Sequence, residues 1–492
     1  MLCLAAIIGA AALLRFWSLG SGVPYALGVD EPEIVERAVH ILKSGDFNPH
    51  FFDYPSLYIY LQALVAIPRF IWGALSGQWG TLASAPATAF YVWARAVTAM
   101  LGTATVYLVY RCARRWDEPT ALVAAAIMAV MPLHVRESHF ALTDVPVTFL
   151  VALTWLLSLS AHRRPDAWRF VLAGAAAGLA MATKYNAVFA IVMPLLACTA
   201  PRMRLSRLQA IAIVVAACAA AFLIAAPYTL LDLPHFLDGF ARLVAAYNGP
   251  SPAEAPVVTY AKHLRNAVGW PAAIAGVAGL LLGIVQIAKG PDRARWALAI
   301  LFPVVYYLFI ARQHIVFARY LLPAVPFVAV LGAVAIVAAS RWVATRSQRA
   351  APIVAAVLIG AAIAPGAVTA LQFDREIGRT WTSELAYSWI LSHVPHGSRV
   401  VIESRNLLLP VGYDARNVPQ LRQQPLDAYR ATGVSYLVAS SQCYGPYLAS
   451  PASDPAAYAD YMRLFIGTEE LARFTPSEQH PGSELRILKV PR

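Results

Sequence analysis

The sequence predicts an all-α, polytopic membrane bundle of about eleven spanning helices, followed by a small soluble α/β domain. Three observations support this prediction. The chain of 492 residues is 59% hydrophobic and only 13% charged, its long apolar runs are separated by short basic clusters, and its composition becomes polar after residue 371. The net charge of +12 lies in those clusters and not in a basic patch with interleaved aromatic residues, so no nucleic-acid partner is expected.

Eleven apolar segments are long enough, or nearly long enough, to cross a hydrocarbon core about 30 Å thick. They are approximately residues 1–19, 88–110, 119–134, 144–161, 168–183, 185–200, 208–230, 269–289, 295–311, 319–340 and 350–371. Residues 1–19 lack a basic start and contain Arg15, so we interpret them as an uncleaved first span and not as a signal peptide. A further segment, 56–75, is interrupted by polar residues and by Pro68.

Basic residues indicate which connections face the cytoplasm. Five connections are basic, and the positive-inside rule places all of them inside: Arg111, Arg114 and Arg115; Arg163, Arg164 and Arg169; Arg202, Arg204 and Arg207; Lys289, Arg293 and Arg295; and Arg341, Arg346 and Arg349. Poorer connections alternate with them at 135–143, near 184, at 231–268 and at 312–318, and these must lie outside. If 1–19 runs outward, then 20–87 begins and ends outside, so 56–75 should lie at the interface or re-enter. We therefore expect a multi-pass protein of a bacterial inner (plasma) membrane, with a cytoplasmic N-terminus and an extracytoplasmic C-terminal domain.

The predicted domains are a membrane domain, 1–371, and a soluble domain, 372–492. In the soluble domain we expect helices at 383–391, 425–431 and 456–465, and strands at 399–403, 435–439, 471–474 and 484–489. This mixture predicts a small α/β domain on the outer face.

The most polar part of the first half is residues 28–61, within a predicted outer loop and interfacial segment, 28–75. Asp30 and Glu31 stand just beyond the first apolar run, and apolar residues at helical spacing follow until Gly45. Carboxylates near hydrocarbon are costly, at roughly 2.5–3.5 kcal/mol each at a helix centre, so their presence needs a reason. The plainer alternative is that Asp30 only caps the helix that begins near Pro32.

Other predicted outer connections bring polar groups to the same face. His139 precedes Asp144 at the start of one span, Lys184 interrupts two apolar runs, and Arg312 and Arg319 flank a later connection. The plainer alternatives are that Asp144 caps its helix and that Lys184 snorkels to water. Together, however, these groups suit one chemistry. A carboxylate can act as general base on an acceptor, while Lys and Arg hold a phosphate that leaves without needing a proton.

Four motifs carry a resemblance to a known family. The first comprises Asp30, Glu31, Ala38, Leu42, Gly45, Asp46, Pro49, Phe51, Pro55, Leu57, Tyr60 and Leu61, and it resembles the first outer loop of the GT-C glycosyltransferases. HFALTDVPVTFL (139–150), GLAMATKYNAVF (178–189) and ARYLLPAVPF (318–327) resemble later motifs of the protein mannosyltransferase and aminoarabinose transferase branch, family 39. The resemblance covers residues 1 to about 371 and is weaker beyond.

The resemblance implies an integral membrane enzyme that takes a sugar from a polyprenyl-phosphate donor at the outer face and inverts its anomeric centre. The acceptor would be a lipid, a glycan or a protein. Asp30, with Glu31 beside it, matches the family's catalytic base. Asp144 matches a second acid that helps to place the acceptor or a metal.

The same resemblance assigns the donor phosphate to Lys184 and Arg319, to which we add Arg312. The remaining substrate and loop candidates are Asp53, Tyr54, His139 and Tyr320. Tyr54 stands where the aminoarabinose branch has Lys, and Glu33 where that branch has Arg.

Two other classes of protein would have different sequence features. A transporter or flippase would place charged or Gly/Pro-broken pairs at mid-membrane and would have two related halves. A non-catalytic scaffold gives no reason for acids at the outer ends of separate spans. A divalent metal stays open as a cofactor, because Asp30, Glu31, Asp53, Asp144, His134 and His139 offer suitable ligand atoms, although no spacing requires one.

Overall fold

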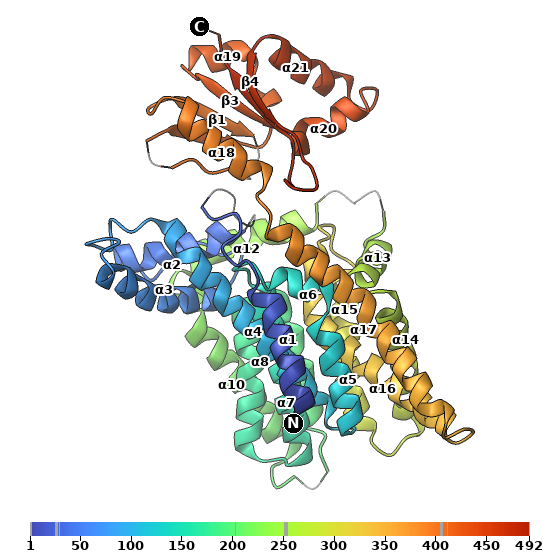
Figure 1. The fold of residues 1–492 in the computed structure, drawn as a ribbon. Coiled ribbons are helices and arrows are strands. Elements are labelled where there is room, and N and C mark those ends of the chain that lie inside the picture. The colour runs from blue at the N-terminus through green and yellow to red at the C-terminus, as the bar shows by residue number, and fades with distance from the viewer. Residues whose placement is uncertain are drawn as a thin grey trace. The chain divides into compact units, whose positions relative to one another are not determined.

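The structure is a computed structural model that describes residues 2–24, 28, 30–201, 203–249, 254–403, 407–410 and 412–491. The chain divides into two compact units: Met1–Leu19 with Glu33–Asp374, and Gly20–Pro32 with Arg375–Arg492. The first unit is a helical bundle and the second is an α/β domain (Figure 1). This confirms the predicted fold class. Arg202, one of the basic residues used for the topology, lies outside the described residues.

The bundle consists of helices joined by short connections. In chain order they are α1 (Leu2–Phe16), α2 (Glu31–Ser44), α3 (Leu57–Leu75), η1 (Ala87–Phe90), α4 (Tyr91–Ala113), α5 (Glu118–Ala129), α6 (Pro132–Glu137), α7 (Asp144–Arg163), α8 (Ala167–Thr183), η2 (Tyr185–Ile191), α9 (Val192–Ala197), α10 (Arg207–Ala225), α11 (Tyr228–Leu231), α12 (Leu233–Tyr247), α13 (Pro256–Val268), α14 (Trp270–Lys289), α15 (Arg293–Ile310), η3 (Ala318–Ala324), α16 (Val325–Ala344) and α17 (Ala350–Ile377).

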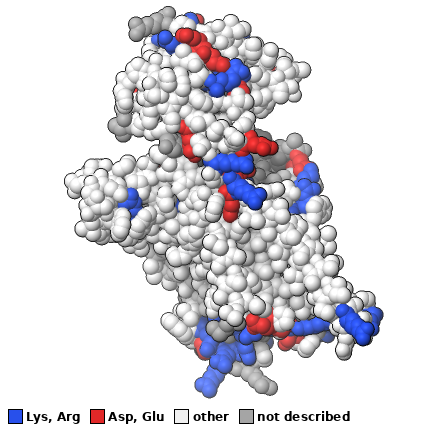
Figure 2. Space-filling view, in the orientation of Figure 1, with Lys and Arg blue, Asp and Glu red and all other residues white. Residues whose placement is uncertain are grey.

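Each of the eleven predicted spans coincides with helical structure. Within the described residues, eight helical stretches are long and apolar enough to cross a membrane, and α3 is one of them. Four of the predicted spans fall on shorter apolar helices, namely Leu2–Phe16, Glu118–Ala129, Ala167–Thr183 and Tyr185–Ala197. The number of helices that cross therefore stays a prediction. On the face shown in Figure 2, charged residues of the bundle gather toward its ends and leave an uncharged belt between them, as a hydrocarbon core requires.

Helices α2 and α3 form a layer of their own. Ile34, Ala38 and Ile41 of α2 are buried against Tyr58 and Ile59 of α3, which accounts for the apolar spacing seen in the sequence. Gly45 ends α2 with a positive φ of 72°, and its N–H donates to the Ile41 carbonyl at 2.9 Å. In Figure 1, α2 and α3 lie across the end of α4 and α8 instead of along them. This orientation agrees with an interfacial α3, which stays a prediction because α3 also has the length of a span.

Small residues let the long helices approach closely. Gly178 of α8 faces the Cys218 carbonyl of α10, and Gly279 of α14 faces the Leu331 carbonyl of α16, at separations that leave no room for a Cβ atom. Such contacts replace hydrophobic driving force inside a membrane, where lipid is as apolar as the helices.

The second unit contains a five-stranded sheet in the order β2-β1-β3-β5-β4. Its strands are β1 (Arg399–Glu403), β2 (Asp414–Val418), β3 (Tyr436–Ser440), β4 (Glu469–Phe474) and β5 (Leu485–Lys489), and its helices are α18 (Thr382–His393), η4 (Leu421–Gln423), α19 (Leu426–Ala431), α20 (Ser441–Ala449) and α21 (Pro455–Ile466). β1 pairs in parallel with β2 and β3, whereas β5 is antiparallel to β3 and β4. α18 packs on one face and α19–α21 pack on the other.

All seven elements predicted in this domain are present. The sequence did not predict β2 or α20. β2 has the sequence DARNV and is almost wholly exposed, so it shows no apolar alternation. α20 contains Gly445 and Pro446, which weaken a helical signal. The segment Gly20–Pro32 joins this unit, and the Ser21 hydroxyl donates to the Ile377 carbonyl at 2.5 Å.

Candidate active site

Three of the predicted site residues meet at the first turn of α7. Asp144 is the first residue of α7, and its side chain is 3% exposed. Its Oδ1 accepts a hydrogen bond from Lys184 Nζ at 2.6 Å, and its Oδ2 lies 3.8 Å from Arg319 Nε. Thr143 occupies the N-cap position. The Asp144 carboxylate is therefore engaged with two cations and does more than cap its own helix.

The local sequence explains how these cations reach Asp144. α8 ends at Thr183, and Lys184 is extended, with φ −155° and ψ 125°, before η2 begins. Arg319 lies in η3, a 3-10 helix that contains Pro323. Each cation thus stands where regular α-helix is interrupted, and Lys184 is only 6% exposed, so it does not snorkel to water.

Tyrosine rings surround the Lys184 ammonium. Lys184 Nζ lies 4.5 Å from the centroid of the Tyr320 ring and 5.8 Å from that of Tyr54. The Tyr320 hydroxyl is 2.5 Å from the Tyr247 hydroxyl, and the Tyr306 hydroxyl donates to the Tyr320 carbonyl at 2.9 Å. Tyr54, which departs from the aminoarabinose branch, therefore contributes a ring face to the same cation.

One acid of the cluster was not selected from the sequence. Glu137, in α6, is 6% exposed and lies 3.8 Å from Arg136. The pKa of Glu137 is raised to about 7, mainly by burial and also by the charge of Asp144, while the charges of Arg136, Arg319 and Lys184 oppose the shift. The only signal in the sequence was its position between two histidines, so its burial could not be foreseen.

Asp30 and Glu31 fall in the other unit, in the turn that leads into α2. Glu31 is buried, its Oε2 accepts a hydrogen bond from the Gly28 N–H at 2.7 Å, and its own N–H donates to the Gly28 carbonyl at 3.0 Å. Glu31 therefore shapes the turn that carries Asp30. The meeting of Asp30 with the Asp144 cluster stays a prediction.

Three other candidates lie on different elements of the chain. Asp53 is exposed on the loop before α3, and Arg312 is exposed after α15, where no described contact joins its side chain to Asp144. His139 is buried; its Nδ1 pairs with the Val135 carbonyl at 2.9 Å, and its Nε2 lies 3.5 Å from Asp374 Oδ1 of α17.

The described part of the chain does not provide a set of ligands for a divalent metal. No three His, Cys, Asp or Glu side chains are grouped there as a metal ion would require. Asp144, the acid that lies closest to the two cations, is bound by Lys184. The cluster is accordingly better matched to an anion than to a cation.

Comparison with known proteins places this geometry in context. Residues 53–239 match the family model described as dolichyl-phosphate-mannose-protein mannosyltransferase. No curated protein sequence matches the chain. The crystal structure of ArnT from Cupriavidus metallidurans bound to undecaprenyl phosphate is similar, with a TM-score of 0.62, 14% identity, and coverage of 99% of this chain and 98% of that one. Archaeal oligosaccharyltransferase AglB from Archaeoglobus fulgidus, in complex with an inhibitory peptide and a dolichol-phosphate, has a TM-score of 0.54, 14% identity and coverage of 89% and 69%.

These matches confirm the predicted resemblance to the GT-C glycosyltransferases. The structural likeness establishes the fold, and the family-model match supports the predicted enzyme class, a glycosyltransferase. The apolar helices and these matches together identify a multi-pass integral membrane protein.

Proposed function

We propose that the chain transfers a sugar from a polyprenyl-phosphate donor to an acceptor on the extracytoplasmic face of a bacterial inner membrane, with inversion of the anomeric centre. The observation that carries this proposal is the buried cluster in which Asp144 holds Lys184 and Arg319 together. The relatives supply the donor class, because ArnT is described with undecaprenyl phosphate and AglB with a dolichol-phosphate.

Lys184 and Arg319 would bind the donor phosphate. A guanidinium offers parallel N–H donors to two phosphate oxygens, and an ammonium supplies a compact positive charge. Because both groups lie within 4 Å of the same carboxylate, one phosphate can reach both of them. The rings of Tyr54 and Tyr320 limit access of water to Lys184 and so strengthen its attraction for an anion.

Asp30 would act as the general base. It takes the proton from the acceptor hydroxyl or amine while the acceptor atom attacks the anomeric carbon from the face opposite the phosphate. The bond from the anomeric carbon to the phosphate oxygen breaks, and the polyprenyl phosphate leaves with the bonding electron pair. A phosphate leaves as an anion without protonation, so this reaction needs no second carboxylate as general acid, unlike ordinary glycoside hydrolysis.

The position of the cluster argues against the transporter alternative. Asp144 begins α7, and Lys184 follows the end of α8, so the charged groups stand at helix ends and not at the middle of a span. A solute pathway across the membrane would require polar groups near the midplane.

The assignment of Asp30 is tested by Asp30→Asn, measured as sugar transfer from the donor that wild type uses. We expect transfer to fall at least about 100-fold, the usual contribution of a general base, while donor binding is retained. Asp238→Asn is the matched control, since Asp238 is exposed on α12 and pairs with Arg242. Full activity of Asp30→Asn would remove Asp30 from the mechanism.

A further inference from the structure

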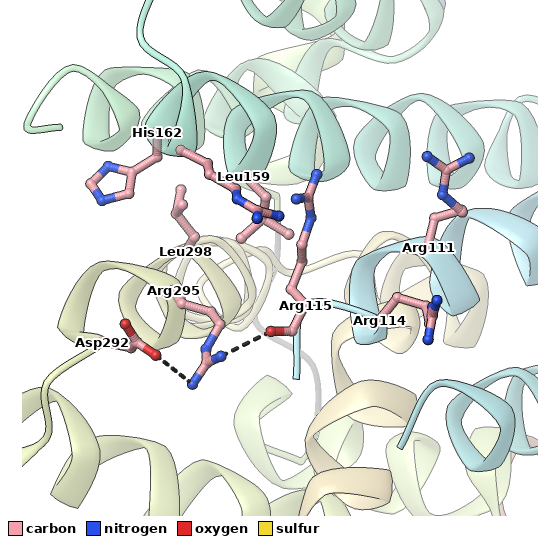
Figure 3. A pocket seen from close by; sticks show the side chains of 9 residues that line it. Arg111, Arg114, Arg115, Leu159, His162, Asp292, Arg295 and Leu298 are labelled. Atoms are coloured by element: carbon pink, nitrogen blue, oxygen red, sulfur yellow. Dashed lines mark hydrogen bonds and ion pairs between the residues drawn. The ribbon is translucent and has the colours of Figure 1, made fainter. Parts of the chain in front are cut away.

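A polar cavity lies at the end of α7 opposite to Asp144. It has a volume of about 580 Å³, and arginines from three helix ends line it: Arg111, Arg114, Arg115, Arg163 and Arg295 (Figure 3). Asp144 and Arg163 are the first and last residues of the 20-residue α7. At 1.5 Å per residue they are separated by roughly 28 Å, so this cavity is distinct from the candidate active site.

The arginines of this cavity outnumber the acids that could balance them. Arg114 pairs with Glu118, and Arg295 pairs with Asp292 at 3.0 Å. In the part of the chain that the structure describes, Arg111, Arg115 and Arg163 form no ion pair. Burial lowers the pKa of Arg115, and the charges of Arg163 and Arg111 lower it further, so these like charges are close enough to repel one another.

Two general rules explain part of this arrangement but not all of it. Arginines are common on the cytoplasmic side of membrane proteins, and cations are favoured at helix C-termini, as at Arg111 and Arg163. Arg295, however, lies in the first turn of α15, where the helix dipole disfavours a cation. Its side chain is 28% exposed: Nη1 donates to the Arg115 carbonyl at 2.9 Å, Nη2 pairs with Asp292, and the buried Nε has no hydrogen-bond partner. Arg295 is therefore held inward beside the Arg115 backbone, instead of extending into solvent as a topology signal alone would require.

We propose that this cavity binds the phosphate headgroup of an anionic membrane phospholipid. Arginine forks match the geometry of phosphate oxygens, and a bound anion would relieve the repulsion among the arginines. The cavity lies at the ends of α4, α7 and α15, which are candidate spans, and therefore at the depth of lipid headgroups. Leu159 and Leu298 supply an apolar wall for the glycerol and the first carbons of the acyl chains. Basic pockets between spanning helices are known to suit such headgroups.

The test is lipid binding to the purified full chain in detergent, measured by native mass spectrometry. The titrants are phosphatidylglycerol, phosphatidylcholine and inorganic phosphate. The cavity variant is Arg115→Gln/Arg163→Gln, and the control is Arg346→Gln/Arg349→Gln, because Arg346 and Arg349 are exposed and outside the cavity. We expect wild type and control to bind phosphatidylglycerol with equal affinity and the cavity variant to bind it at least about tenfold more weakly, since each lost charge-assisted bond costs that much or more.

Arg111→Gln is a second cavity variant, which keeps the test valid if the double variant fails to fold. Arg111 is exposed, so its replacement leaves the packing of α4 intact. This single variant should also bind phosphatidylglycerol more weakly than the control. Equal binding by the cavity variants and the control would overturn the proposal. So would equal binding of phosphatidylcholine and phosphatidylglycerol, or binding of inorganic phosphate in preference to the lipid. The measurement reports lipid binding and is independent of sugar transfer.

Discussion

Replacement of Lys184 by methionine isolates the contribution of one buried charge to donor binding. Methionine keeps an unbranched side chain between the rings of Tyr54 and Tyr320 but removes the ammonium that lies 2.6 Å from Asp144. Breaking a buried ion pair costs about 3–5 kcal/mol of folding stability when one partner is left uncompensated. Because Arg319 still lies 3.8 Å from Asp144, we expect a loss near the lower limit, about 3 kcal/mol.

The effect on the donor is calculated separately. A hydrogen bond to a charged group contributes about 1.5–3 kcal/mol, so the loss of Lys184 should raise the Kd for polyprenyl phosphate by about 10- to 100-fold. A ligand at 100 times its Kd stabilises a folded protein by about 2.7 kcal/mol. At that same concentration, a variant with a 100-fold higher Kd would gain only about 0.4 kcal/mol.

The assay is unfolding of the purified protein with and without polyprenyl phosphate, for wild type, Lys184→Met and Lys262→Met. Lys262 is an exposed lysine that pairs with Glu254, so its variant should keep the full stabilisation by ligand. If Lys184→Met also kept the full stabilisation, the phosphate would not be held by Lys184, and the assignment of the cluster would be refuted.

Three further predictions concern other parts of the structure. Glu137, whose pKa is raised to about 7, becomes charged as pH rises through 7. The contribution of Glu137 to folding stability should therefore fall as pH rises from 4.5, its ordinary pKa, to about 7. Donor affinity should fall as pH rises through 7, where the folded protein gains the Glu137 charge, and Glu137→Gln should flatten the donor titration; parallel curves would contradict this. Gly279→Ala should destabilise the bundle by about 1–3 kcal/mol because its Cβ would overlap the Leu331 carbonyl, whereas Gly360→Ala, in open space on α17, should be neutral or stabilising in the same unfolding measurement. Glu403→Gln should speed hydrogen exchange in β1 and β3, because Glu403 accepts bonds from the N–H groups of Leu421 and Ser440 at 2.8 and 2.9 Å and the amide would leave one of them unpaired; unchanged exchange would show that the carboxylate is dispensable.

Much of the architecture can be predicted from the sequence, because the length of the apolar runs and the spacing of apolar residues largely determine where the helices form. The eleven apolar runs coincide with helices, and Gly45 ends α2 as its place after the apolar repeat predicts. β2 could not be predicted, because its exposed, polar sequence has no alternation of apolar and polar residues. It is a strand because it pairs with β1.

Asp144, Lys184 and Arg319 could be singled out from the sequence one by one, but their mutual contacts could not; their roles in a site stay a prediction. Asp144, Lys184 and Arg319 each interrupt an apolar context, and this marked them individually. Their contacts depend on the extended backbone at Lys184 and on the 3-10 turn at Arg319, neither of which the sequence specifies. Glu137 was missed because its burial depends on how α6 packs.

The arginine cavity shows a different limit of sequence reasoning. Arg111, Arg115, Arg163 and Arg295 served as topology signals, since their number and position were all that the sequence provided. Their convergence on one concave surface follows from the packing of α4, α7 and α15. Arginines that line one cavity differ in this way from arginines that each extend into solvent, and only the three-dimensional structure distinguishes the two cases.

Sugar release from a radiolabelled panel of polyprenyl-phosphate sugars tests the central claim most directly. Membranes that contain the wild-type chain are compared with membranes that lack it. The proposed function predicts that one donor loses its sugar only when the chain is present, and that polyprenyl phosphate appears in equal amount. If no donor in the panel loses its sugar, and the purified chain also fails to bind any of them, the proposed glycosyltransferase activity is contradicted.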